Sequence, residues 1–311
     1  MLERARSAAV IGAGMTGLTV ADKLTSAGWN VSVFEKGRAR GGRISTRRTP
    51  RGFFDHGAPE IDARGEDFRR FLNTLGAVGD AHGRLFGKPG MRSIFDPLGE
   101  AVTIRQATEI AGLKRESPGW VLRRRDGREF AHYDHVIVTI PAPQAADLVR
   151  SVDPSLAYEV SAVRMQPVWT CMVEFETPVD CPDMSENGPV LRADRMGGKP
   201  GRTDDRNAWV IHMKPEFAEA TINVDPELMA PQILEAFAET CGMELPGVIY
   251  LSAHRWRFAF ADQPLGRPYL MSSHQDLLVG GDWTLGRRAE DGFDSGRAMA
   301  HSILSQELAY R

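Results

Sequence analysis

Residues 8–17 read Ala-Ala-Val-Ile-Gly-Ala-Gly-Met-Thr-Gly and predict a strand, a glycine turn and the start of a helix. Gly12 permits the tight turn, Gly14 lets a pyrophosphate approach the backbone, and Gly17 lets helix and strand pack closely. The helix is expected to run to Gly28. Its N-terminus offers free N–H groups and a partial positive charge, which together favour a bound phosphate.

A second strand, Val31–Phe34, follows and ends at Glu35, 23 residues after Gly12. A carboxylate at the tip of this strand is suited to binding both hydroxyls of a ribose. Because both strands and the acid are in register with the glycines, the segment predicts a complete dinucleotide-binding unit. An isolated GxGxxG would be a much weaker signal.

The loop after Glu35 is rich in glycine and arginine, where a simple NAD dehydrogenase would normally continue into another helix. Arginine suits a phosphate because its planar fork binds oxygens in pairs and stays charged. Taken singly, most of these arginines fit a solvated basic loop, and Arg43, behind Gly41 and Gly42, is the exception. The element resembles the GG-R segment of the flavin amine oxidase superfamily, which favours FAD over NAD. The six arginines are residues 38, 40, 43, 47, 48 and 51.

Composition places the chain among ordinary globular proteins, and its 311 residues favour two domains. A net charge of −3 gives no general reason to expect nucleic acid or an anionic membrane as a partner. The segment Met1–Ser7 leads directly into the first strand, so we expect no signal peptide, no membrane span and a cytoplasmic address. Three cysteines without CxxC spacing support neither a disulfide framework nor a zinc site, and no metal is expected.

The pattern of elements predicts an α/β fold. A Rossmann-like FAD-binding domain is expected to be discontinuous, and a second, mixed α+β substrate domain to be built on an antiparallel sheet. Residues 180–207 are rich in Gly, Asp, Pro and Arg and are expected to form a mobile excursion. We assign residues 1–64, 94–148 and 272–311 to the first domain, and residues 65–93 and 149–271 to the second.

Five segments, in the same order along the chain, resemble the renalase branch of the FAD amine oxidase superfamily, in its bacterial form. The dinucleotide unit with its GG-R tail is the first of them. The others are Phe54–Ala58, Gly87–Met91, His254–Ala259 and Gly280–Trp283. The resemblance implies the p-hydroxybenzoate hydroxylase or amine oxidase type of fold.

The resemblance also implies a set of residues that bind FAD without a covalent bond, since no cysteine follows Cys241. Two departures from the family pattern border the site, Glu290-Asp291 before the last helix and Pro59-Glu60 after the Asp-x-Gly-Ala segment. The implied FAD-binding residues are Gly12, Gly14, Met15, Thr16, Gly17, Glu35, Lys36, Gly42, Arg43, Gly57, Ala58, Ile110, Gly281, Asp282, Gly292 and Phe293.

Renalases oxidise 2- and 6-dihydro isomers of NAD(P) to NAD(P)+ and pass the electrons to O2 as H2O2. Because the product is an aromatic cation, no substrate proton must be removed, and the sequence offers no certain catalytic acid or base. Candidates for the substrate pocket are His254, Trp256, Trp283 and Arg255. The alternative for both tryptophans is core packing. For His254 the alternative is a structural role, and for Arg255 it is a salt bridge between domains.

Two rival functions stay open on the sequence. A flavin amine oxidase acting on a small amine would normally hold a water with a lysine. The sequence offers no clear candidate beyond Lys88, which is more simply explained as a solvated turn residue. A non-catalytic FAD-binding interaction protein would bind the cofactor without turnover. The oligomeric state and the physiological electron acceptor are not fixed by the sequence.

Overall fold

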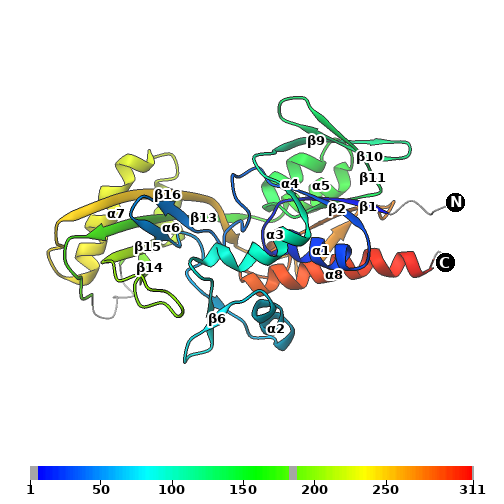
Figure 1. The fold of residues 1–311 in the computed structure, drawn as a ribbon. Helices are drawn as coiled ribbons and strands as arrows, with labels where there is room; N and C mark the ends of the chain where they lie inside the picture. The colour runs from blue at the N-terminus through cyan, green and yellow to red at the C-terminus, as the bar shows by residue number, and fades with distance from the viewer. Residues whose placement is uncertain (1–5, 182–187, 310–311) are drawn as a thin grey trace.

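The computed structural model describes residues 6–181 and 188–309. The expectation about a leader therefore falls largely outside it, on residues 1–5. Figure 1 shows two lobes, with β1, β2, α1 and α8 in one and β13–β16 with α6 and α7 in the other. No helix within the described ranges is long and apolar enough to cross a membrane.

The first lobe is organised by a six-stranded sheet in the order β17-β18-β12-β1-β2-β8, parallel except for β17. The first strand is buried on both faces: Ala8 and Val10 join one core, and Ala9 and Ile11 join the other. This explains its continuous apolar sequence, which is typical of a parallel strand covered on both sides. The strands are β1 (Ser7–Ile11), β2 (Asn30–Phe34), β8 (Thr103–Arg105), β12 (His135–Val138), β17 (Tyr269–Met271) and β18 (Leu277–Gly280).

One face of this sheet packs against helices α1 and α8, and the other against a three-stranded antiparallel sheet and helices α4 and α5. Both packing layers are visible in Figure 1, with β9–β11 above the sheet and α1 and α8 below it. These elements are α1 (Met15–Ser26), α8 (Ala289–Ala309), β9 (Ile110–Glu116), β10 (Gly119–Arg124), β11 (Glu129–Tyr133), α4 (Ala142–Val149) and α5 (Pro154–Ser161).

The second lobe contains an antiparallel sheet in the order β14-β15-β13-β16. Helices α6 and α7 cover one face through a core that includes Trp169 and Phe237. The opposite face meets the first lobe, where Phe54 packs on Met172 and Val210. The elements are β13 (Met165–Phe175), β14 (Val190–Arg195), β15 (Ala208–Met213), α6 (Pro215–Ala220), α7 (Pro226–Cys241) and β16 (Val248–Ala261).

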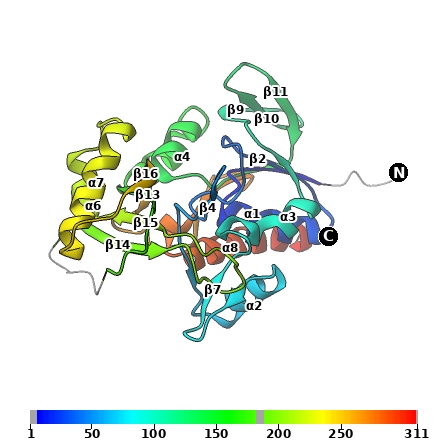
Figure 2. The same cartoon turned by 60° about the vertical axis from the view of Figure 1, so that its left-hand side comes forward.

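Short elements connect the two lobes along the underside seen in Figure 2, where α2 and β7 lie below the main sheets. A two-stranded hairpin, β3 with β4, carries the arginine-rich loop toward the second sheet. The remaining short elements of the chain are β3 (Arg47–Thr49), β4 (Gly52–Phe54), β5 (Ile61–Asp62), α2 (Glu66–Thr74), β6 (Val78–Gly79), β7 (Arg84–Phe86), η1 (Met91–Phe95), α3 (Asp96–Ala101) and η2 (Asp282–Thr284).

The predicted fold class is confirmed, but two local expectations are wrong. Within 180–207, the described residues from 188 onward are not a mobile excursion. They include strand β14 and a strap, residues 196–206, in which Arg202 bonds Asp55 of the first lobe and Arg206 bonds Glu174 of the second. The charged residues of the strap form these bonds to distant parts of the chain, and local composition cannot predict such partners. The domain boundaries stay a prediction. Strand β17 ends at residue 271, just before the predicted start of the last FAD-domain segment at 272, yet it pairs with β18 of that segment.

The cysteines also differ from the expectation. Cys181 and Cys241 form a disulfide, and Cys171 is a buried free thiol. The two bonded cysteines are 60 residues apart and are brought together when α7 packs on the sheet, so local spacing gave no sign of the pair.

We therefore expect a thiol titration to find one reactive thiol in the unfolded protein and none in the native protein. Burial raises the pKa of Cys171 to about 12, which keeps it an unreactive thiol in the folded chain. A titre of three thiols in denaturant would contradict the bond. In the control, iodoacetamide is added to the native protein before unfolding, so that any accessible thiol is blocked. Because disulfides are rare in cytosolic proteins, the same titre tests the expected cytoplasmic address.

Candidate FAD and substrate site

The glycine turn lies at the carboxyl end of β1, where ligands bind in open parallel sheets. Gly12 has φ +107°, a conformation that favours glycine, and its N–H donates to Phe34 O at 2.8 Å. A Cβ on Gly17 would lie 2.0 Å from Gly12 O, so this glycine is required by the contact between helix and turn. Gly12 and Gly17 are thus explained by the protein alone.

Gly14 is different, because a Cβ there would meet no atom closer than Gly42 Cα at 4.0 Å. Its φ of −85° suits any residue, so neither strain nor packing within the protein requires glycine. It precedes α1, whose first N–H groups have no partner within the helix. The first turn of α8 is close by, since a Cβ on Gly292 would lie 3.0 Å from Thr16 Oγ1 and 3.7 Å from Asp282 Cβ. Two helix N-termini and an open backbone therefore converge on one place.

Glu35 lies directly after β2, and its carboxylate accepts hydrogen bonds from the glycine turn and from the loop that follows β2. One carboxylate oxygen accepts from Ala13 N at 2.9 Å, and the other accepts from Gly37 N at 2.6 Å. Lys36 donates to Gln144 Oε1 at 3.1 Å on the exposed side. The structure thus places the predicted ribose-binding acid beside the turn, where it also fixes the loop.

Arg43 and Asp282 are paired with each other. The guanidinium donates to both carboxylate oxygens, at 2.7 and 2.5 Å, and also to Ala259 O at 2.6 Å. The pair connects the GG-R loop to the segment after β18, and therefore joins residues 239 positions apart. Both predicted contacts of the diphosphate region lie together, and each fixes the orientation of the other.

The segment Asp55–Ala58 is held by both lobes. Its acid, Asp55, is fully buried and accepts from Thr46 Oγ1 at 2.7 Å and Met91 N at 2.9 Å. Two cations of the strap complete the shell: Lys199 Nζ lies at 3.2 Å and Arg202 Nη1 at 2.5 Å. Burial alone would raise the pKa of Asp55, but these two cations lower it below its usual value.

Three rings cluster where this segment meets β16. His56 stacks on Trp256 with centroids 5.3 Å apart, and His254 contacts both rings edge-on, at 5.0 and 4.5 Å. Burial lowers the pKa of His56 to about 3, with His254 and Arg47 adding to the effect. Burial, and then Arg47 and Arg255, lower that of His254 to about 4. Both imidazoles are therefore neutral at pH 7.

His212 is a site residue that the sequence analysis missed. Its Nε2 bonds Gly57 O at 3.0 Å, just as Trp256 Nε1 donates to His56 O at 2.9 Å. Register across the sheet places Thr170 between His212 and His254 on neighbouring strands. Thr170 Oγ1 and the Nδ1 atoms of His56 and His212 are buried without a partner among the described residues. The only local signal was a histidine in the apolar strand 208–213.

Two of the four predicted pocket residues do not join this cluster. Trp283 is fully buried in the core of the first lobe and donates to Ile140 O at 3.1 Å. Arg255 points to the other face of β16, where it donates to Ile222 O and Val224 O and lies 5.3 Å from the centre of the Trp169 ring. The alternation of side chains along a strand explains why Arg255 separates from its neighbours.

The remaining expected FAD residues lie at the same edge, except that two side chains belong to cores. Phe293 packs between Phe68 and Phe71, so only its backbone lies at the start of α8. Ile110, the first residue of β9, is buried in the second core of that lobe. Gly57 leaves no room for a side chain, because a Cβ would lie 1.9 Å from Arg43 O.

The two departures from the family pattern have structural roles. Glu290 accepts from Gly65 N at 2.6 Å, which bonds the start of α2 to α8, and Asp291 accepts from Arg288 N at 2.7 Å. Pro59 O accepts from Lys199 at 3.0 Å. Glu60 forms ion pairs with Arg84 and Arg192 on neighbouring segments. Glu290, Pro59 and Glu60 therefore join elements around the site, whereas Asp291 caps the start of its own helix.

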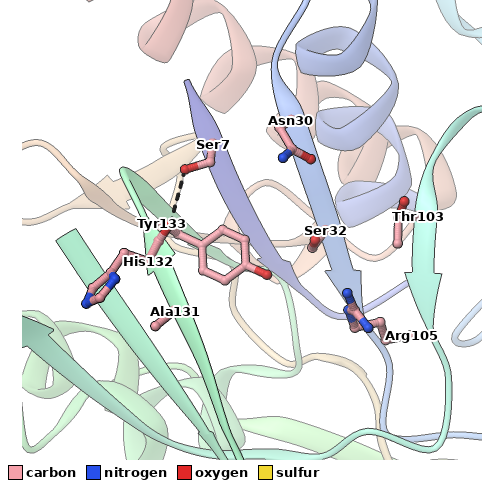
Figure 3. A pocket seen from close by; sticks show the side chains of 8 residues that line it. All are labelled: Ser7, Asn30, Ser32, Thr103, Arg105, Ala131, His132 and Tyr133. Atoms are coloured by element: carbon pink, nitrogen blue, oxygen red, sulfur yellow. Dashed lines mark hydrogen bonds between the residues drawn. The ribbon is translucent and has the colours of Figure 1, made fainter. Parts of the chain in front are cut away.

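A hollow of about 500 Å³ lies elsewhere, beside the first residues of β1, β2 and β8 (Figure 3). Ser7, Asn30 and Thr103 begin these strands, so the hollow is at the amino end of the sheet. Ligands of parallel sheets bind at the opposite end. None of the expected site residues lines it, and we assign it no part in the chemistry.

The residues at the carboxyl end of the sheet fit FAD. The open backbone at Gly14 would accept a pyrophosphate, two helix N-termini would complement its charge, and Glu35 lies where a ribose-binding acid is expected. The ring cluster lies beside Gly57 and Ala58, next to the GG-R loop, as expected for the flavin end. The cysteines offer no covalent attachment here, since two are bonded to each other and the third lies in the α6/α7 core.

Comparison with known proteins supports this assignment. A family model described as flavin containing amine oxidoreductase matches residues 70–304, and one described as NAD(P)-binding Rossmann-like domain matches residues 10–75. A neurosporene-forming phytoene desaturase of Cereibacter sphaeroides is 36% identical over 114 residues, which are 36% of this chain. The matched part spans only 22% of that desaturase.

Solved structures share the fold over nearly the whole chain. A candidate protoporphyrinogen oxidase from Exiguobacterium sp. 255-15 superposes with a TM-score of 0.78 at 13% identity, covering 96% of this chain and 98% of the other. Putrescine oxidase bound to putrescine gives 0.67 at 14% identity, with 96% and 99% covered. Together with the family match over three quarters of its length, this shows that the chain belongs to the flavin-containing amine oxidoreductase family, with FAD as its cofactor.

Proposed function

We propose that this protein oxidises isomeric, 2- or 6-dihydro forms of NAD(P) and passes the electrons to O2. One dihydronicotinamide, one O2 and one proton would give one NAD(P)+ and one H2O2. Bound FAD supplies the hydride acceptor. The chain's own residues bind the nicotinamide, orient it and exclude water from it.

The observation that carries the proposal is the neutral ring cluster of His56, His254 and Trp256 beside the FAD segment. A flat, uncharged dihydropyridine packs well against such rings, and an indole face stabilises the pyridinium that forms. His254 and Trp256 are half-buried, so the cluster has a side open to a ligand. Trp256 and His212 fix the peptide groups on which the cluster rests.

The same cluster is poorly suited to an amine substrate, which is the main alternative. A small amine is a cation at neutral pH and must lose a proton before it can donate a hydride. Imidazoles with pKa values of about 3 and 4 are weak bases for that task. Asp55 and Asp194, whose charges act on His56 and His212, are each bonded to cations, so neither is free to attract an ammonium group.

The proposal is tested by anaerobic rapid mixing of the purified holoenzyme with 2- and 6-dihydroNAD, while the oxidised flavin band is followed. We expect the band to bleach within the turnover time, with one NAD+ formed per flavin. A panel of amines, putrescine included, serves as the control. Reduction by an amine alone would establish the amine oxidase function, and reduction by neither donor would favour a non-catalytic role.

We expect the rate constant of flavin reduction to be nearly constant between pH 5.5 and 9. Burial lowers the pKa of His56 and His254 to about 3 and 4, so both keep their neutral forms across this whole range. Stopped-flow rates at saturating dihydroNAD measure this directly. A rate that rises with an apparent pKa between 6 and 8 would contradict the assignment of neutral histidines to the site.

A further inference from the structure

Arg47 stands beside the ring cluster and has an unusual position among the arginines of its loop. It is the first residue of β3, pairs with Phe54 across the hairpin, and reaches the second lobe, where Nη1 donates to Ser252 Oγ at 3.2 Å. Ser252, His254 and Trp256 alternate along β16 and therefore share one face. Ser252, the residue that Arg47 contacts, is two residues from His254, which corresponds to about 7 Å along the strand.

Among the residues that the structure describes, no carboxylate neutralises the charge of Arg47. Arg43 is bonded to Asp282 and Arg51 to Glu174, whereas Arg47 forms no ion pair within residues 6–181 and 188–309. It is half-buried and lies close enough to lower the pKa of both His56 and His254. A guanidinium held by one hydroxyl beside two neutral imidazoles leaves most of its donors for an anion.

We propose that Arg47 binds the phosphate attached to the nicotinamide riboside of the substrate, and so determines specificity for nucleotides. The inference rests on the proposed function and names the part of the substrate that lies away from the reacting ring. When the nicotinamide ring lies on Trp256 and His254, its ribose spans the distance to Ser252, the next residue of β16 on this face. The guanidinium of Arg47 lies there, because it donates to Ser252. The phosphate neutralises a charge that would otherwise lie near the pyridinium product.

The test compares a nucleotide with its phosphate-free counterpart in the FAD-loaded protein. Nicotinamide mononucleotide and nicotinamide riboside, both oxidised, are titrated against the flavin absorbance spectrum, so that binding is measured without turnover. The 6-dihydro forms of the same pair are then used for stopped-flow reduction. We expect Arg47→Gln to weaken binding of the mononucleotide about 10- to 100-fold and to leave riboside binding within about twofold. Arg47→Lys is expected to recover part of the loss.

Arg48→Gln is the matched control, because it removes the same charge one position along β3. Arg48 is exposed and lies over the Phe53 ring at 5.8 Å, so we expect it to change neither ligand. Equal losses for mononucleotide and riboside in Arg47→Gln, or wild-type binding that ignores the phosphate, would overturn the inference. Arg47-dependent binding of the mononucleotide without reduction by either dihydro form would leave the inference standing and reject the proposed function.

Discussion

Replacing Asp55 by asparagine is expected to lower the free energy of unfolding by about 3–5 kcal/mol, the usual cost of removing one partner from a buried ion pair. Asp55 is fully buried, and its carboxylate is the only acid bonded to Lys199 and Arg202 among the described residues. Without it, two cations with side chains 8% and 5% exposed would remain in the interior. Chemical denaturation of the apoprotein, followed by tryptophan fluorescence, measures the loss.

Asp67→Asn is the matched control, because it removes a carboxylate from an exposed pair with Arg297. Its cost should stay below about 1 kcal/mol. The pH dependence gives a second check. The pKa of Asp55 is lowered in the folded protein, so its contribution is complete above the unfolded value of about 3.9 and is lost as the pH falls through the folded value. Asp55→Asn should therefore be less sensitive to acid than the wild type. A loss no larger than the control's would show that the strap does not depend on this cluster.

The parts of the fold that the sequence predicted are those fixed by local patterns. The turn at Gly12–Gly17 follows from backbone geometry that few other residues adopt, and the β-branched run at Val136–Ile140 is typical of a strand covered on both faces. Glu35 and Arg43 could be singled out as FAD-binding candidates because their positions are set by distance from the turn. Their place beside the FAD edge follows from the topology of one sheet.

The residues that were missed become neighbours only through packing between the lobes. His212 reaches Gly57 across 155 positions, and Lys199 reaches Asp55 across 144. No period or motif connects such partners, and the polar composition of the strap resembles that of a loop. Arg255 and Trp283 were misplaced for the opposite reason: a motif named them, while strand alternation and burial decided where their side chains point.

Replacing either Gly14 or Gly17 by alanine should weaken FAD binding, but only Gly17→Ala should damage the fold. At Gly17 the new methyl would lie 2.0 Å from Gly12 O and 2.6 Å from Thr139 Oγ1, contacts that force helix and turn apart. We expect a loss of about 2–3 kcal/mol or more in the stability of the apoprotein. Denaturant unfolding without FAD measures this loss.

At Gly14 the methyl would meet no protein atom closer than 4.0 Å, and the backbone is already in a conformation open to alanine. The apoprotein should therefore be as stable as the wild type, or slightly more so because alanine restricts the unfolded chain. The methyl would instead occupy the space in which the pyrophosphate approaches the start of α1. We expect the Kd for FAD to rise about 10- to 100-fold, equivalent to about 1.4–2.8 kcal/mol. Fluorescence titration of apoprotein with FAD gives this value, and unchanged affinity in Gly14→Ala would move the diphosphate away from this turn.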